Sequence, residues 1–269
     1  MSLSLGDFDY VRRLASQDSA LMLGDHKAYL VEARLAPIAE REGCASVTEL
    51  VGLLRTGRTA LRDDVVQSLT TNETSFFRDV HPFDALRDVL LPAAIAARGR
   101  AAVWSAAAST GQEAYSVAMI AAGSFPDERV SILATDLSRD VLARAAAGEF
   151  TQLEVNRGLP AALLVRHFER AGSRWQIRPD VRRRVQFRQL NLARPWPALP
   201  PMDVVLLRNV LIYFDAPAKR AALAQVARVL APGGVLFLGG AETTYGLADG
   251  WERMQIGRSF FYTPTGHQE

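Results

Sequence analysis

Short apolar runs that resemble β-strands begin only after residue 100 of this chain, and they alternate there with helical patterns. Five such runs occupy residues 101–104, 130–134, 185–187, 204–207 and 235–238. Alternation of this kind predicts a mostly parallel sheet, because each parallel connection needs a crossover that a helix supplies. A further aromatic run at residues 259–262 is expected to pair beside residues 235–238.

The first 71 residues show helical periodicity without strand-like runs. Apolar side chains recur at spacings of three and four residues, as at Phe8, Val11 and Leu14, which is the pattern of one buried helix face. We therefore predict an all-helical domain at residues 1–71. A linker is predicted at residues 72–82, followed by an α/β domain at residues 83–269.

Residues 150–187 form a stretch too long for a simple connection in an α/β sheet. Apolar and polar residues alternate between Trp175 and Phe187, with Pro179 and Asp180 between the two halves. We predict an inserted antiparallel β subdomain at about residues 150–187, with a turn at Pro179. Covering the sheet edge and binding a partner are equally open roles for this subdomain.

The composition is typical of a soluble globular protein. Hydrophobic residues make up 49% of the chain and charged residues 22%, with a formal net charge of +2, which argues against a disordered tail or a nucleic-acid coat. The single cysteine, Cys44, allows no internal disulfide, and the four histidines lack metal-ligand spacing. Since no signal pattern or membrane-spanning apolar run is present, we expect a cytoplasmic protein without a metal or membrane insertion.

Residues 104–115, with the sequence WSAAASTGQEAY, connect a predicted strand to a predicted helix. Small side chains let main-chain N–H groups approach a ligand, and the first turn of a helix leaves such groups unpaired. The loop has neither the G-x-G-x-x-G pattern of dinucleotide sites nor the lysine of a P-loop. It therefore favours an adenosyl ligand without phosphates, while a tight helix entry without any ligand is the alternative.

Polar residues also follow two other predicted strands. Asp136 ends the run ILATD, where an acid can accept hydrogen bonds from both ribose hydroxyls; capping a helix that begins near Ser138 is its alternative role. Asn209 ends the run VVLLRN, and Tyr213 follows it. Strand ends in α/β sheets face ligands, although Asn209 could serve only a turn and Tyr213, with Phe214, only the core.

The segment TTNETSFFRD, residues 70–79, lies at the junction of the helical and α/β parts. Asn72, Thr74 and Arg78 bring hydrogen-bonding groups, while the two phenylalanines are expected to anchor the segment in apolar contacts. A segment at such a junction is well placed to act as a lid over a ligand.

Together these blocks resemble the CheR family of chemotaxis receptor methyltransferases over nearly the whole chain. The matching motifs, in the family's order, are TTNETSFFRD, VWSAAASTGQEAYSVAM, ATDLSRDVLARA, the pair Asn191 and Leu192, and RNVLIYFD. The resemblance implies a Rossmann-like α/β methyltransferase with an N-terminal helical domain and an inserted small antiparallel β subdomain. It also implies a protein-glutamate O-methyltransferase that uses S-adenosylmethionine, releases S-adenosylhomocysteine and forms glutamyl methyl esters on chemoreceptors.

The resemblance further implies roles for individual residues. Arg78 and Tyr213 would be catalytic residues nearest the transferred methyl group, Asp136 would hold the ribose, and Glu113 would lie beneath the methionyl end. The implied cofactor contacts are Asn72, Thr74, Arg78, Ala107, Glu113, Asp136, Asn191, Leu192, Asn209 and Val210. A glutamate acceptor is ionised at neutral pH, with a reference pKa of about 4.3, so no histidine base is required. The implied partner is the cytoplasmic helical domain of chemoreceptors, with no nucleic acid.

Two segments depart from the family's pattern. In well-studied members the second helix carries a dense arginine face, whereas here Arg34 is followed by Pro37, Glu40 and Glu42, which weakens charge steering toward a receptor. Members that bind a receptor's C-terminal pentapeptide tether carry a longer glycine-containing loop in the β subdomain, and only residues 171–173 fill that place here. This chain is therefore expected to act independently of such a tether.

Two other functions remain open from the residues. One is a methyltransferase that acts on RNA or a small molecule, with Arg182, Arg183 and Arg184 facing phosphates. The other is a non-catalytic module that senses the cofactor. The presence of Arg78 and Tyr213 argues against the second.

Overall fold

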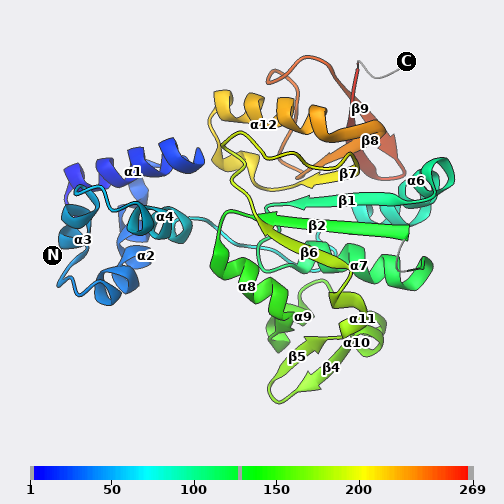
Figure 1. Cartoon of the computed structure of the whole chain (residues 1–269), viewed down its shortest axis with the longest axis horizontal. Coiled ribbons are helices and arrows are strands. Elements are labelled where there is room, and N and C mark those ends of the chain that lie inside the picture. Colours follow the sequence, from blue (N-terminus) through cyan, green and yellow to red (C-terminus); the bar gives the residue numbers. More distant parts are fainter. Residues whose placement is uncertain (1–2, 127–128, 266–269) are drawn as a thin grey trace.

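A computed structural model describes residues 3–126 and 129–265 (Figure 1). Within these residues, a seven-stranded sheet forms the centre, a bundle of helices lies to one side of it, and a small second sheet lies beyond one edge (Figure 1). The predicted fold class is therefore confirmed. Within the same residues, no helix combines the length and the apolar character needed to cross a membrane.

The N-terminal bundle contains α1 (Leu5–Ser19), α2 (Ala28–Arg41), α3 (Val47–Leu54) and α4 (Thr59–Ser68), with the short 3-10 helix η1 (Asp25–Lys27) before α2. Serine side chains begin two of these helices, since Ser4 accepts a hydrogen bond from Asp7 N and Ser46 accepts one from Glu49 N. The apolar faces meet in a core of their own. This core includes Leu35, Leu50 and Val65, which are fully buried.

The central sheet has the order β6-β2-β1-β7-β8-β10-β9. Its strands are β1 (Ala101–Ala106), β2 (Val130–Asp136), β6 (Val185–Gln189), β7 (Met202–Leu207), β8 (Leu230–Leu238), β9 (Trp251–Ile256) and β10 (Ser259–Pro264). The first five strands in that order pair in parallel. As predicted, β10 pairs beside β8, with Tyr262 opposite Leu236. Strand β9 was not predicted, because its residues are largely exposed and lack apolar alternation.

Helices cover both faces of this sheet. The connecting helices are α5 (His81–Ala85), the π-helical turn η2 (Leu86–Leu90), α6 (Leu91–Arg98), α7 (Gln112–Ser124), α8 (Arg139–Ala147), the 3-10 turn η4 (Leu211–Tyr213) and α12 (Ala216–Val229). Two adjacent residues of β1 belong to the hydrophobic cores on the two faces of the sheet. Val103 lies in the core that includes α7, and Trp104 lies in the core that includes α12. Because both faces are covered there, the inner strands β1, β2 and β7 are buried along nearly their whole length rather than at alternate positions.

The inserted subdomain consists of β3 (Glu149–Phe150), α9 (Gln152–Asn156), α10 (Ala161–His167), β4 (Phe168–Ala171), β5 (Arg174–Ile177) and α11 (Pro179–Arg182). Its antiparallel sheet has the order β3-β5-β4. The expected turn at Pro179 and Asp180 was wrong, because Pro179 begins a helix, where its fixed φ and missing N–H are tolerated. The expected antiparallel strand at Val185 and Phe187 was also wrong, because β6 pairs in parallel with β2.

The linker is held against this subdomain through Phe76. Its side chain is fully buried, and its ring lies edge-on to Phe150 and Phe168, with centroid distances of 5.0 and 5.8 Å. Gly158, which follows α9, has a left-handed φ of 88° and lies so close to the Phe76 carbonyl that no β-carbon fits between them. The subdomain therefore positions the segment that continues into Arg78.

Replacing Gly158 with alanine is expected to destabilise the protein more than the same change at Gly172. Both glycines have a left-handed φ, so alanine at either position costs about 1 to 2 kcal/mol in backbone strain. Gly172 has no neighbour within 4 Å, whereas a β-carbon at Gly158 would collide with the Phe76 carbonyl, which adds about 1 kcal/mol. Urea denaturation measures the difference, and equal free energies of unfolding would contradict this packing.

Candidate active site

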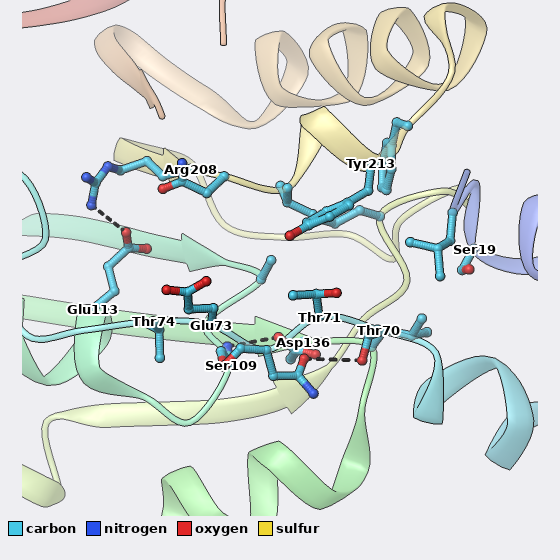
Figure 2. A pocket seen from close by; sticks show the side chains of 18 of the residues that line it. Ser19, Thr70, Thr71, Glu73, Thr74, Ser109, Glu113, Asp136, Arg208 and Tyr213 are labelled. Atoms are coloured by element: carbon cyan, nitrogen blue, oxygen red, sulfur yellow. Dashed lines mark hydrogen bonds and ion pairs between the residues drawn. The ribbon is translucent and has the colours of Figure 1, made fainter. Parts of the chain in front are cut away.

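A pocket lies where the carboxyl ends of β1, β2, β6 and β7 meet (Figure 2). Its empty volume is about 920 Å³, counting the part that is open to solvent, which suits a small-molecule ligand. Every predicted site residue lines it, although these residues come from distant parts of the chain: Asn72, Thr74, Arg78, Ala107, Glu113, Asp136, Asn191, Leu192, Asn209, Val210 and Tyr213. Their individual roles remain predictions.

Ala107 and Ser109, in the loop between β1 and α7, line this pocket. Ala107, Ser109 and Gly111 all have left-handed φ values, of 64°, 52° and 95°, which larger or branched side chains rarely adopt. A β-carbon at Gly111 would lie 3.0 Å from the β-carbon of Ala145 and 3.1 Å from the ring of Tyr115. Close packing beneath the loop therefore requires the small residues of the sequence, and no side chain caps the first turn of α7.

Asp136, at the end of β2, is buried and faces this loop. Its Oδ2 accepts a hydrogen bond from Ser109 N at 2.9 Å, and its Oδ1 accepts one from Ser138 N at 3.0 Å. The carboxylate therefore fixes the loop and the residue that precedes α8. The alternative role as a helix cap was wrong, because Ser138 and not Asp136 is the N-cap of α8. Burial raises the pKa of Asp136, and the backbone N–H groups of Ser138 and Ser109 oppose that shift. Each oxygen keeps a lone pair that can accept a ribose hydroxyl.

Affinity for S-adenosylhomocysteine is expected to weaken as the pH falls toward the raised pKa of Asp136. The family resemblance implies that the deprotonated carboxylate accepts hydrogen bonds from both ribose hydroxyls, so this part of the affinity is expected to be present above that pKa and lost below it. The loss should begin above the ordinary aspartate pKa of about 3.9. Calorimetric titrations across a pH series test this, with Asp136→Asn as the control because Glu113 also has a raised pKa. An unchanged pH dependence in Asp136→Asn would assign the titration to another group.

A buried ion pair closes the opposite end of the pocket. Arg208 is almost inaccessible, with 1% of its side chain exposed, and its Nη1 lies 3.0 Å from Glu113 Oε2. Glu113 Oε1 also accepts a hydrogen bond from Ser105 Oγ at 2.7 Å. Burial raises the pKa of Glu113, while the charge of Arg208 and the Ser105 hydrogen bond act in the opposite direction. Figure 2 shows this pair beyond Glu73, away from the N-terminal bundle.

Arg208 also ties the linker to this end of the pocket. Its Nη2 donates to the Arg78 carbonyl oxygen at 2.8 Å and to Asp79 Oδ2 at 2.6 Å. The linker is strained here, since Phe77, Asp79 and Val80 all have left-handed φ values, and such strain is typical of functional sites. Arg208 was not predicted as a site residue, although an arginine that is buried at the end of the apolar run VVLLR needs an acidic partner.

The end of α1 forms a third part of the pocket wall. Ser19 and Leu21 line it. Asn191 Nδ2 donates to the Asp18 carbonyl oxygen at 2.6 Å, and Met22 N donates to the Tyr213 carbonyl oxygen at 2.8 Å. The helical bundle therefore contacts two of the predicted site residues directly, a contribution that helical periodicity does not reveal.

Tyr213 reaches over the pocket from η4 (Figure 2). Its ring is half-buried and packs against both the bundle core and the core beneath α12, so the site role and the packing role are combined. The lining residues that were not among the predicted site residues are Ser19, Leu21, Thr70, Thr71, Glu73, Ser109, Leu137, Leu190, Arg208 and Phe214.

The residues present fit an adenosyl ligand. An open backbone loop, an acid at the end of the second strand and a wall of Leu190, Leu192 and Val210 suit a nucleoside without a pyrophosphate. Two arginines, Arg78 and Arg208, line the pocket. Arg208 forms ion pairs with Glu113 and Asp79. No histidine, lysine or cysteine is among the described residues that line the pocket.

Comparisons with known proteins agree with this geometry. Residues 72–259 match the SAM-binding domain of CheR methyltransferases, and residues 6–70 match the all-alpha domain of the same family. The fold, the pocket and the matched domain define a methyltransferase that uses S-adenosylmethionine. The chain belongs to the CheR methyltransferase family.

Relatives that align over nearly their whole length are named chemotaxis protein methyltransferases. Chemotaxis protein methyltransferase 1 of Pseudomonas aeruginosa is 42% identical over 272 residues, which cover 97% of this chain and 99% of that protein. Chemotaxis protein methyltransferase 1 of Vibrio cholerae is 40% identical over 263 residues, which cover 94% of each. The alignment with a solved DhpI complex with SAH covers 70% of this chain and 68% of the DhpI chain. The sequence identity is 18% and the TM-score is 0.38, a likeness too low to inform function.

Proposed function

We propose that this protein transfers the methyl group of S-adenosylmethionine to glutamate side chains of chemoreceptors, forming glutamyl methyl esters. The choice of a carboxylate as the methyl acceptor rests on one observation: none of the described residues that line the pocket is a free general base. Glu113 is held in the buried ion pair with Arg208 and accepts a hydrogen bond from Ser105. Asp136 accepts backbone hydrogen bonds from Ser109 and Ser138, and its remaining acceptor capacity is assigned to the ribose in this proposal. An ion pair with Arg157 lowers the pKa of Glu73 and makes it a weak base. An acceptor that is already ionised, such as a carboxylate, needs no base.

The proposed cofactor contacts follow the wall of the pocket. Asp136 accepts hydrogen bonds from the ribose, Asn191 and Leu192 border the adenine, and Glu113 lies beneath the methionyl end. Asn72, Thr74 and Ala107 contribute from the linker and the loop, and Asn209 with Val210 closes the pocket near the sulfur. When bound, S-adenosylmethionine supplies a methyl group on a cationic sulfur and leaves as S-adenosylhomocysteine.

Arg78 and Tyr213 are the proposed catalytic residues. Arg78 lines the pocket from the linker, where its guanidinium can orient a carboxylate. Tyr213 reaches over the pocket from η4 (Figure 2). Attack of a carboxylate on a cationic methyl donor cancels charge, so orientation of the two reactants is the main contribution left to the protein. Correct orientation is worth about 7 to 11 kcal/mol in favourable cases.

Locating the methyl group tests this proposal. The protein is incubated with S-adenosylmethionine and a purified cytoplasmic chemoreceptor fragment, and the modified residues are mapped by mass spectrometry. Methylated glutamates are expected, and replacing the mapped glutamates with glutamine should remove the signal. Methyl groups found only on RNA, or no transfer to any receptor, would overturn the proposal. A phosphate-binding role for Arg182 and Arg184 is disfavoured, because their side chains already contact the carbonyl oxygens of Ala147 and Phe125, respectively.

The proposal includes a cytoplasmic location and the helical cytoplasmic domain of chemoreceptors as the partner. It also includes the division into a helical domain at residues 1–71, a linker at 72–82 and a methyltransferase domain at 83–269. The end of α1 lines the pocket, so the helical domain and the methyltransferase domain are expected to act together.

Independence from a receptor's pentapeptide tether is part of the same proposal. Strands β4 and β5 are joined by Gly172 and Ser173 alone, so no extended loop is present to hold a peptide. Calorimetry with a receptor's C-terminal pentapeptide should show no binding at micromolar concentrations. Micromolar affinity, or a receptor fragment that loses methylation when the pentapeptide is removed, would contradict this.

A further inference from the structure

Glu242, in the loop after β8, accepts three backbone hydrogen bonds through one carboxylate. Its Oε2 accepts from Asn209 N and from Gly239 N, each at 2.7 Å, and its Oε1 accepts from Ile212 N at 3.1 Å. Glu242 itself does not line the pocket. Two of its three donors, however, belong to the turn that follows β7.

This turn, residues 209–213, carries three of the proposed site residues: Asn209, Val210 and Tyr213. Little regular structure holds it in place. Asn209 has a left-handed φ of 58°, and the 3-10 turn η4 contains only three residues. Left-handed backbone costs about 1 to 2 kcal/mol in a residue other than glycine, so the conformation needs external support. A carboxylate that accepts backbone N–H groups provides strong hydrogen bonds of this kind.

Gly239 allows the loop and the turn to approach each other. A β-carbon at this position would lie 2.6 Å from Asn209 Nδ2 and 2.8 Å from Glu242 Oε2. The glycine therefore leaves space for both side chains at the end of β8. The Glu242 carboxylate lies where the loop after β8 contacts the turn after β7.

We propose that Glu242 is a positioning residue of the cofactor pocket. By holding the backbone of Asn209 and Ile212, it sets the position of the Asn209 side chain and the direction in which Tyr213 reaches over the pocket. This inference rests on the cofactor role proposed above for Asn209 and on the catalytic role proposed for Tyr213. It does not depend on which molecule accepts the methyl group.

Calorimetric titration of the full-length protein with S-adenosylhomocysteine tests the inference without any acceptor. Glu242→Ala is expected to raise the Kd about tenfold, which corresponds to about one lost hydrogen bond. Glu242→Gln should fall between Glu242→Ala and the unsubstituted protein, because its one carbonyl oxygen can still accept from Asn209 N and Gly239 N. Glu252→Gln, on the exposed side of β9, is the matched control and should leave the Kd unchanged.

A double-mutant cycle separates positioning from a purely structural role. If Glu242 acts through Asn209, the Glu242→Ala penalty on the Kd should shrink when Asn209→Ala is already present. The same fold-change in both backgrounds, or a normal Kd in Glu242→Ala, would overturn the inference. Should Glu242→Ala fail to fold, Glu242→Gln serves in the same cycle. An unchanged Kd in Asn209→Ala alone would instead refute the cofactor role of Asn209, so the two failures are distinguishable.

Discussion

Replacing Arg208 with alanine is expected to lower the free energy of unfolding by about 3 to 5 kcal/mol. The change leaves the Glu113 carboxylate buried without its cation, and it removes the hydrogen bonds that hold the Arg78 carbonyl and Asp79. Urea denaturation followed by circular dichroism measures this loss. Affinity for S-adenosylhomocysteine should fall as well, because the linker end of the pocket loses its anchor.

Arg139→Ala is the matched control for this prediction. Arg139 also pairs with an acid, Asp64 at 3.3 Å, but 58% of its side chain is exposed, so its removal should cost no more than about 1 kcal/mol. A further variant that removes both charges, Arg208→Met with Glu113→Leu, should recover part of the stability. An Arg208→Ala protein as stable as the Arg139→Ala protein would show that the buried pair does not support the fold.

Replacing Arg78 with alanine is expected to lower kcat about a hundredfold, because small errors in the placement of reacting groups have effects of this size. Arg78 lines the pocket, and among the described residues its guanidinium makes one long hydrogen bond, to the Glu73 carbonyl oxygen at 3.4 Å. Its guanidinium is therefore available to a ligand, and its loss should cost little stability. Steady-state kinetics with a chemoreceptor fragment, together with calorimetry on S-adenosylhomocysteine, measures turnover and cofactor affinity separately.

Arg87→Ala is the control, because Arg87 lies on η2 in exposed ion pairs with Asp84 and Asp88. Tyr213→Phe should also lower kcat while the protein stays folded, since the ring keeps its packing. The assignment of Arg78 fails if Arg78→Ala leaves both kcat and cofactor affinity unchanged.

The sequence predicted the sheet well because buried parallel strands leave a clear apolar pattern. It also placed Asp136, Asn209 and the loop at residues 104–115 at one edge, because the carboxyl ends of parallel strands meet there. The antiparallel strand β9 escaped prediction, since it lies at the sheet edge, its residues are largely exposed and half of them are polar.

The remaining parts of the site depend on tertiary contacts that periodicity does not encode. Ser19 looks like any residue at a helix end, and only the docking of the bundle brings it to the pocket. Glu242 lies more than thirty positions from Asn209, and no local pattern links the two. The inserted subdomain was misjudged for a local reason: an alternating pattern near Pro179 fits a hairpin as well as a short helix followed by a parallel strand.

The most direct test of the proposed reaction is the alkali lability of the transferred methyl group. The protein is incubated with S-adenosylmethionine labelled in its methyl group and with chemoreceptor-rich membranes, and the labelled receptor is then treated with base. Glutamyl methyl esters release labelled methanol under these conditions, and we expect this release. Label that stays on the receptor in base, or that appears only on RNA or small molecules, would contradict glutamate methylation.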